Sequence, residues 1–116
     1  MEYLRTDESR FDDLPGYPFE PHYSEVPDLE GGTLRMHYLD EGEGEVILCL
    51  HGQHSWSYLY RKMLPIFLEA GSRVVAPDFI GFGRSDKPTS MDDYTYANHV
   101  AWLKALLEAL DLSDIT

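Results

Sequence analysis

The stretch Val46-Ile47-Leu48-Cys49-Leu50-His51-Gly52-Gln53-His54 decides the fold, because its apolar run ends abruptly at a glycine and polar residues. Five apolar residues bounded by turn residues are typical of a strand that is buried on both faces. A helical pattern begins soon afterwards, at Trp56. The sequence therefore predicts a strand, a tight loop and a helix in direct succession.

The loop after this strand has the composition of an anion-stabilising turn. Gly52 lets the backbone turn sharply and leaves peptide N–H groups free. Such N–H groups, close to the first turn of a helix, can stabilise a developing negative charge, as in an oxyanion hole. His51, His54 and Trp56 are expected to support the loop. The pattern indicates hydrolytic chemistry but supplies only one part of the machinery.

The segment that follows predicts a βαβ unit. Apolar residues at positions 56, 59, 60, 63, 64 and 67 mark one helical face. Pro65 is expected to kink or shorten the last turns of this helix, and Gly71 to close it. Residues 73–78 form a second buried strand, so the strands at 46–50 and 73–78 should be parallel.

The remaining elements extend this unit on both sides. Residues 1–23, rich in proline, glycine and aromatic side chains, predict an irregular arm laid over a surface. Strands at 24–29 and 33–40 should form a hairpin through Gly31-Gly32. The body of the domain then spans residues 24–116. The fold class is α/β, with an antiparallel hairpin leading into a parallel sheet with flanking helices.

A second helix is expected to start near Thr95, which is a suitable N-cap residue. Its apolar stripe is formed by four residues: Val100, Leu103, Leu107 and Leu110. Ile115-Thr116 has the character of the first step of a third parallel strand, at the point where the sequence ends.

Composition limits the class of partner. The chain has 116 residues, and 21 Asp and Glu against nine Lys and Arg give a net charge of −12. Such a charge repels nucleic acid and anionic lipid, so neither is expected as a partner. Cys49, the only cysteine, is expected to be a buried structural thiol. A lone cysteine, no signal core and no membrane-spanning run together predict a cytoplasmic protein.

Two motifs have a ligand-binding and a structural interpretation. Gly81-Phe82-Gly83 follows a strand, but Asp86 holds the place of the third glycine of a dinucleotide fingerprint, and Pro88 delays the helix. A structural loop, with Asp78 accepting hydrogen bonds from loop N–H groups, is the better interpretation. His51 and His54 have a metal-like spacing but lack further ligands nearby, so no metal is expected. His51 is more consistent with a packed, hydrogen-bonded residue.

The motifs in this sequence do not include a recognisable serine nucleophile. The chain has no Gly-x-Ser-x-Gly elbow, and none of Ser55, Ser57 and Ser85 lies between a strand and a helix with small flanking residues. The sequence thus contains an oxyanion loop without a nucleophile.

Several motifs together resemble one enzyme family. They are Tyr17-Pro18-Phe19, Tyr38-Leu39-Asp40-Glu41-Gly42, the stretch 56–63 after His51-Gly52, and Ala76-Pro77-Asp78 followed by Gly81-Phe82-Gly83 and Ser85-Asp86-Lys87-Pro88. They resemble the haloalkane dehalogenases of the α/β-hydrolase fold. The resemblance implies the N-terminal part of that fold, incomplete because the nucleophile elbow, the cap domain and the histidine would lie beyond residue 116.

The resemblance also implies a mechanism and reactants. An aspartate displaces halide from a small halogenated substrate, and a histidine then activates water to hydrolyse the ester. No cofactor is implied. Gln53 takes the position whose backbone N–H joins the oxyanion hole, and its side-chain amide is a second donor for the halide. His54 replaces the proline usual in this turn, so the loop is either strained or follows a different path.

Two further interpretations stay open. An epoxide hydrolase shares the loop after the strand at 46–50 and would need two cap tyrosines to protonate the epoxide oxygen. A non-catalytic remnant, or a subunit that pairs with a separate C-terminal piece, is the alternative from another class. In the 116-residue chain by itself, the strand at 46–50 is expected to lack the neighbour on its far side, and this unpaired edge is expected to favour self-association.

Overall fold

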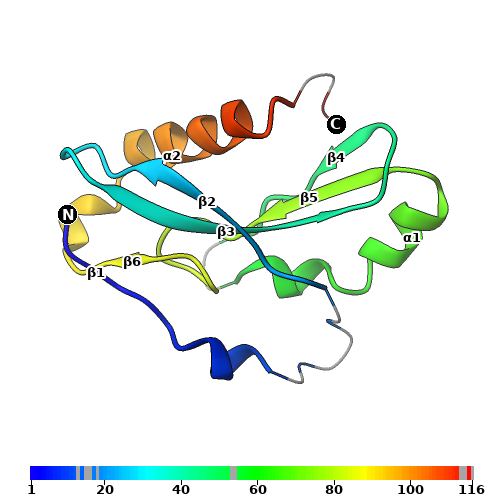
Figure 1. Cartoon of the computed structure of the whole chain (residues 1–116), viewed down its shortest axis with the longest axis horizontal. Helices are drawn as coiled ribbons and strands as arrows, with labels where there is room; N and C mark the ends of the chain where they lie inside the picture. Colours follow the sequence, from blue (N-terminus) through cyan, green and yellow to red (C-terminus); the bar gives the residue numbers. More distant parts are fainter. Residues whose placement is uncertain (13, 15–16, 18, 53–54, 113–114, 116) are drawn as a thin grey trace.

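A four-stranded mixed sheet organises the chain in the computed structural model, which describes residues 1–12, 14, 17, 19–52, 55–112 and 115 (Figure 1). Its strands are β2 (His22–Pro27), β3 (Thr33–Glu41), β4 (Val46–Leu48) and β5 (Arg73–Pro77). Their order is β2-β3-β5-β4. A separate two-stranded ribbon joins β1 (Tyr3–Leu4) to β6 (Lys87–Pro88).

The predicted parallel pair is present, and β4 lies at the edge of the described sheet. β4 and β5 are parallel, with Ile47 opposite Val74. β4 is shorter than the expected 46–50, although the N–H of Cys49 still donates to Val75 at 2.9 Å. The expectation of burial on both faces is wrong for Leu50, which is 39% exposed, because β5 is the only strand described beside β4.

The predicted hairpin is also present, with its first strand displaced along the sequence. β2 begins and ends two residues before the expected 24–29, and it pairs with β3 from His22 opposite Tyr38 to Pro27 opposite Thr33. The turn depends on Asp28, whose Oδ1 accepts from the N–H groups of Glu30 at 2.7 Å and Gly32 at 2.8 Å. An aspartate that satisfies turn N–H groups in this way ends the strand at Pro27.

The single helix expected from Trp56 is instead two elements. A 3-10 turn, η2 (Ser57–Tyr60), is followed by the short helix α1 (Leu64–Glu69). Pro65 lies in the first turn of α1, where its missing N–H removes no helical hydrogen bond, so it starts the helix rather than kinking its end. Gly71 closes α1 as predicted, at φ +85°, and Ser72 N–H bonds back to Phe67.

The long second helix begins where the sequence predicted. α2 (Tyr96–Ala109) follows the short 3-10 turn η3 (Met91–Asp93), and the Thr95 side chain accepts from the N–H of Asn98. Its buried residues are Trp102 and Leu106, which the expected stripe did not include. Of that stripe, Leu110 packs against the core, whereas Val100 is 47% exposed. The contact with β2 sets the rotation of the helix about its axis, because that contact buries the large Trp102 ring.

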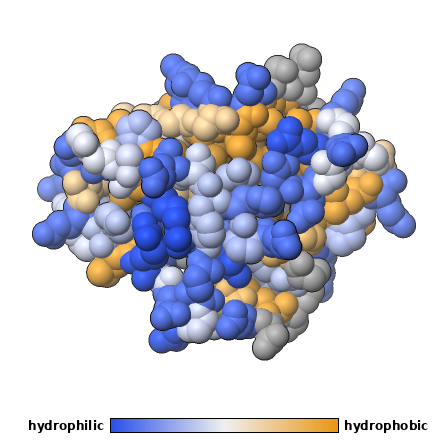
Figure 2. Space-filling view, in the orientation of Figure 1, coloured by the Kyte–Doolittle hydropathy of each residue, from blue (hydrophilic) through white to orange (hydrophobic). Residues whose placement is uncertain are grey.

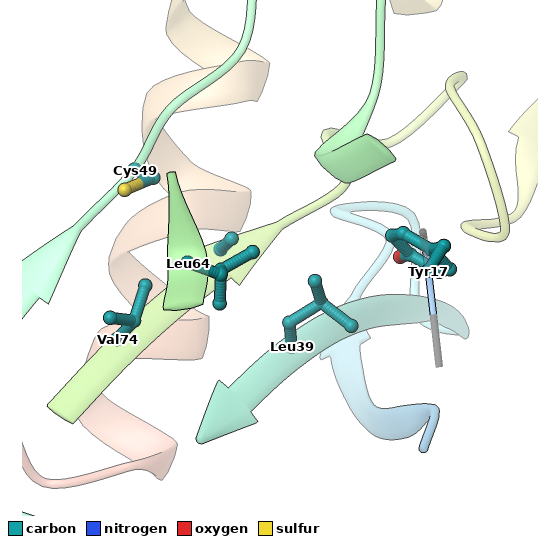
Figure 3. Packing of buried hydrophobic residues seen from close by; sticks show 6 residues of the cluster. Tyr17, Leu39, Cys49, Leu64 and Val74 are labelled. Carbon is teal, nitrogen blue, oxygen red and sulfur yellow. The ribbon is translucent and has the colours of Figure 1, made fainter. Parts of the chain in front are cut away.

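Side chains on the two faces of the sheet build two separate cores. On one face α2 packs over a cluster of buried residues: Val26, Leu34, Met36, Ile80, Trp102 and Leu106. On the other face, shown in Figure 3, the cluster is Tyr17, Leu39, Cys49, Leu64, Val74 and Ala76. Alternate residues of β3 serve the two clusters, as the two-residue period of a strand requires. Cys49 is buried and unpaired by any disulfide, and burial raises the pKa of its thiol.

The N-terminal arm is held by ion pairs as well as by aromatic packing. Arg5 makes a two-pronged contact with the fully buried carboxylate of Asp86, at 2.6 and 2.8 Å. Glu8, in the 3-10 turn η1 (Glu8–Phe11), contacts Arg84 at 3.2 Å. The ring of Phe11 lies 5.3 Å from that of Trp56. The aromatics predicted this docking, whereas the ion pairs connect positions too distant in sequence to be paired by inspection.

The exterior is acidic, in keeping with the net charge of −12. On the face seen in Figure 2, hydrophilic residues dominate the centre and hydrophobic patches lie nearer the margin. Large side chains that are well exposed include Ile66 on α1, Met91 in η3 and Tyr96 at the start of α2.

A buried carboxylate at the end of β5 joins several segments. Asp78 Oδ1 accepts from Ser57 N–H at 2.6 Å, and Oδ2 accepts from Arg84 N–H at 3.0 Å and from His37 Nδ1 at 2.7 Å. Burial alone would raise the pKa of Asp78, but the bond and charge of His37 and the two N–H donors hold it below its usual value. Asp78 therefore accepts from loop N–H groups, as the sequence predicted.

We expect Asp78→Asn to lower the free energy of unfolding by about 3–5 kcal/mol, because either orientation of the amide turns an NH₂ group towards a donor. Asp40→Asn is the matched control, since Asp40 pairs with Arg73 at a partly exposed position and should lose about 1 kcal/mol or less. Urea denaturation at neutral pH measures both. Because the folded-state pKa of Asp78 is lowered, its contribution holds above about pH 4 and fades below it, so the Asp78 difference should shrink in acid. Equal losses for the two variants would contradict the role given to Asp78.

We also expect Gly83→Ala to destabilise the protein more than Gly31→Ala. Both glycines have positive φ, +53° and +93°, so both changes carry a backbone cost of about 1–2 kcal/mol. A Cβ at Gly83 would lie 2.5 Å from Asp78 Oδ2 and 2.8 Å from Trp56 Cβ, whereas one at Gly31 meets open space. The crowding should add about 1–3 kcal/mol. A Gly83→Ala protein as stable in urea as Gly31→Ala would show that the loop yields easily.

Candidate functional site

The loops after β4 and β5 lie at the same edge of the sheet, because the two strands are parallel. His51 connects them. Its Nε2 accepts from the N–H of Phe79 at 2.9 Å, and its Nδ1 lies 2.7 Å from the carbonyl oxygen of Gly52. The carboxyl ends of parallel strands are where ligands bind in open α/β sheets. The candidate site is therefore built on a bridge between these two loops.

The hydrogen bonds of His51 fix its protonation state. Nε2 carries no proton because it accepts from a backbone N–H, and Nδ1 carries the proton because it donates to a carbonyl. The imidazole is thus neutral. His51 is 95% buried, and its ring stands edge-on to those of Phe79 and Phe82, with centroids 4.8 and 5.3 Å away. His51 is a packed and hydrogen-bonded residue.

An apolar hollow of about 860 Å³ opens beside this bridge. Its walls come from the two loops, η3 and the N-terminal half of α2. The lining residues are Leu50, His51, Gly52, Phe79, Gly81, Phe82, Met91, Tyr94, Thr95, Tyr96, His99, Val100 and Leu103. Small-molecule sites are concave and mostly apolar with a few polar groups, and this hollow has that character.

Gly81 and Gly52 contribute to the hollow in different ways. A side chain at Gly81, which has φ +96°, would collide with the ring of Tyr94. That ring is held in place by its hydroxyl, which donates to the carbonyl oxygen of Pro88 at 2.6 Å. Gly52 is exposed, and apart from its chain neighbours no atom of the described residues lies within 4 Å of where its Cβ would be.

His99 belongs to the hollow and was missed by sequence reasoning, which treated it as one of several scattered histidines. It lies one turn into α2, with its ring 5.9 Å from that of Phe79 and 5.4 Å from that of Trp102. Burial lowers the pKa of His99. Its buried Nδ1 has no hydrogen-bond partner among the described residues. A clue was its position four residues after the Thr95 cap.

The other predicted site residues are distributed as follows. Gln53 and His54 lie outside the described residues. Trp56 faces the arm rather than the hollow, stacked on Tyr58 with ring centroids 5.5 Å apart. Asp78 and Gly83 both belong to the loop after β5, and the Asp78 carboxylate leaves no room for a side chain at Gly83.

The glycine loop has few N–H groups to offer a phosphate. Gly81 N–H donates to Asp86, Phe82 N–H to Phe79, and Arg84 N–H to the Asp78 carboxylate. Two buried carboxylates, those of Asp78 and Asp86, would also repel an anion. The structural interpretation of this loop therefore accounts for its geometry better than a nucleotide site does.

Within the part of the chain that the structure describes, no three His, Cys, Asp or Glu side chains are grouped so that they could hold a metal ion. Among the same residues, no helix combines the length and the apolar character needed to cross a membrane.

Comparison with known proteins agrees with this architecture. The family described as alpha/beta hydrolase fold matches residues 45–116. The haloalkane dehalogenase of Psychrobacter cryohalolentis is 58% identical over 100% of this chain and 39% of its own length, and that of Mycolicibacterium paratuberculosis is 53% identical with the same coverage. The chain thus spans about two fifths of the length of these curated relatives.

Among solved structures, a haloalkane dehalogenase matches this chain better than an epoxide hydrolase does. The haloalkane dehalogenase DpaA from Paraglaciecola agarilytica, described as tetrameric, matches with a TM-score of 0.93 and 49% identity over 100% of this chain and 40% of its own. An epoxide hydrolase from Vigna radiata matches less well, with a TM-score of 0.72 and 34% identity over 81% of this chain and 29% of its own. Loop geometry, strand order and these matches together show that the chain belongs to the alpha/beta hydrolase fold family, with haloalkane dehalogenases among its homologues.

Proposed function

We propose that this chain forms the N-terminal part of a hydrolase of the haloalkane dehalogenase type, acting on small halogenated alkanes with water. The observation that carries the proposal is the sequence identity of 52–58% to haloalkane dehalogenases, over alignments that cover the whole chain. Epoxide hydrolases are the second candidate, because they share the fold at 34–35% identity over 81% of the chain.

The geometry of the candidate site supports this assignment. The His51–Phe79 bridge fixes the start of the loop after β4 at the sheet edge where a reacting group would sit. The adjacent hollow is lined mainly by apolar and aromatic side chains. A haloalkane has an apolar body and releases one anion, so it needs an apolar pocket with a few N–H donors on one side.

The proposed reaction has two steps. In both, the rest of the protein supplies the reacting groups and this chain supplies a hydrogen-bond donor. A carboxylate oxygen attacks the carbon, the carbon–halogen bond breaks, and halide leaves as an alkyl ester forms. Water, deprotonated by a general base, then hydrolyses the ester to alcohol and carboxylate. The nucleophile and base belong to the remainder of the protein. In this proposal Gln53 supplies an N–H donor that stabilises negative charge.

A hybrid enzyme tests the assignment. Residues 1–116 would replace the matching part of the Psychrobacter cryohalolentis enzyme, whose remaining residues supply the nucleophile, base and cap. We expect the hybrid to release halide from short haloalkanes and the 116-residue chain alone to release none above a heat-killed control. A folded hybrid that releases no halide would contradict the assignment, and halide release by the chain alone would contradict the division of work.

We further expect Gln53→Ala to slow turnover of the hybrid and weaken halide binding, with little change in melting temperature. Loss of a transition-state donor typically reduces the rate by about 10²–10³-fold, and the surviving backbone N–H would make this loss smaller. Glu43→Ala, in the exposed turn before β4 at the other end of the sheet, is the control and should leave the kinetics unchanged. Identical kinetics for the Gln53→Ala and unmodified hybrids would remove Gln53 from the site.

A further inference from the structure

The segment from His51 to Ser57 is held at both ends by two consecutive residues, Asp78 and Phe79. At its start, His51 Nε2 accepts from Phe79 N–H at 2.9 Å. At its end, Ser57 N–H donates to Asp78 Oδ1 at 2.6 Å. Both anchoring residues directly follow β5. The positions of both ends of this loop are therefore set by the same two residues after β5.

The first anchor depends on the neutral His51 ring. Nε2 has to remain unprotonated to accept from Phe79, and the Nδ1 proton is used by the Gly52 carbonyl at 2.7 Å. Packing against Phe79 and Phe82 leaves His51 only 5% exposed, so its ring cannot swing out without opening that contact. The hydrogen bond from Nδ1 to the Gly52 carbonyl therefore holds Gly52 in place as well.

The second anchor depends on a carboxylate that is itself immobile. Asp78 and Ser57 are both fully buried. Asp78 is held by His37 and by Arg84 N–H, and the Ser57 hydroxyl lies 2.6 Å from that of Tyr17. Both anchors attach directly after β5, a strand that is paired on both sides, with β3 and with β4.

We propose that His51 and Asp78 are positioning residues, which clamp the two ends of the segment that carries Gln53 in sequence. This inference rests on the proposed function, because it assigns the clamp the task of setting where the loop N–H groups meet the reacting atoms. Misplacement of such groups by about 1 Å can reduce a rate by about 10²-fold.

The first end is tested with His51→Phe and His51→Gln in the hybrid enzyme. Phenylalanine retains a planar ring between Phe79 and Phe82 but removes the acceptor. Glutamine places an oxygen near the position of Nε2 and can accept from Phe79 N–H. We expect kcat to fall about 10²-fold in His51→Phe with KM little changed, and most of that loss to be recovered in His51→Gln.

The second end is tested with Ser57→Pro and Ser57→Ala. Proline removes the N–H that binds Asp78, at the first position of a 3-10 turn and after Trp56, whose extended backbone is suited to precede proline. Alanine keeps the N–H and removes only the hydroxyl that meets Tyr17. We expect the proline variant to lose kcat in the same manner as His51→Phe, and the alanine variant to retain it.

Hydrogen exchange separates the clamp from the proposed reaction. Amides of residues 51–57 should exchange about tenfold faster in His51→Phe and Ser57→Pro than in their matched partners. Unchanged exchange would overturn the clamp, and faster exchange with unchanged kcat would overturn its positioning role. If the unmodified hybrid releases no halide, the proposed function fails, and the exchange rates alone still decide whether the clamp exists.

Discussion

The burial of one negative charge, that of Asp78, constrains most of the described structure. A carboxylate in the protein interior is tolerated only when each oxygen meets donors, since an unpaired buried charge is strongly destabilising. The donors come from three separate places: the His37 ring in β3, the backbone at Ser57 and the backbone at Arg84. The sheet, the entry to α1 and the glycine loop therefore share one electrostatic requirement, and none of the three can shift without disturbing the other two.

Local signals in the sequence predicted most of the elements. The hairpin, the parallel pair, the Gly71 helix end and the Thr95 cap each depend on residues adjacent to the feature that they specify. The errors arose where distant contacts decide. Apolar spacing alone extended a helix back to Trp56, whereas that side chain is used in aromatic packing against the arm. The same spacing turned α2 towards Val100, whereas packing on β2 buries Trp102.

The sequence predicted the part of the candidate site that lies in the loops after β4 and β5. It did not predict the side chains around α2 that line the hollow. His51, Gly52 and Asp78 are recognisable because each follows a strand and has an obvious backbone role. Tyr94 and His99 are not, since their importance comes from a helix start that the fold brings beside Phe79. The kind of chemistry was inferred from family resemblance, because an oxyanion loop by itself is compatible with several hydrolytic reactions. Gln53, the residue with the most specific assignment, lies outside the described residues.

The attachment of the arm has a consequence for the order in which the protein takes shape. Arg5 and Asp86 are separated by 81 positions, and Glu8 and Arg84 by 76. Contacts of such high sequence separation close large loops and form late. During synthesis the arm leaves the ribosome before β2 to β5, yet its partners emerge only after these strands are complete, so it has to wait undocked while the sheet assembles. A segment made before the sheet is thus placed after it, and the aromatic surface beneath the arm stays uncovered throughout that interval.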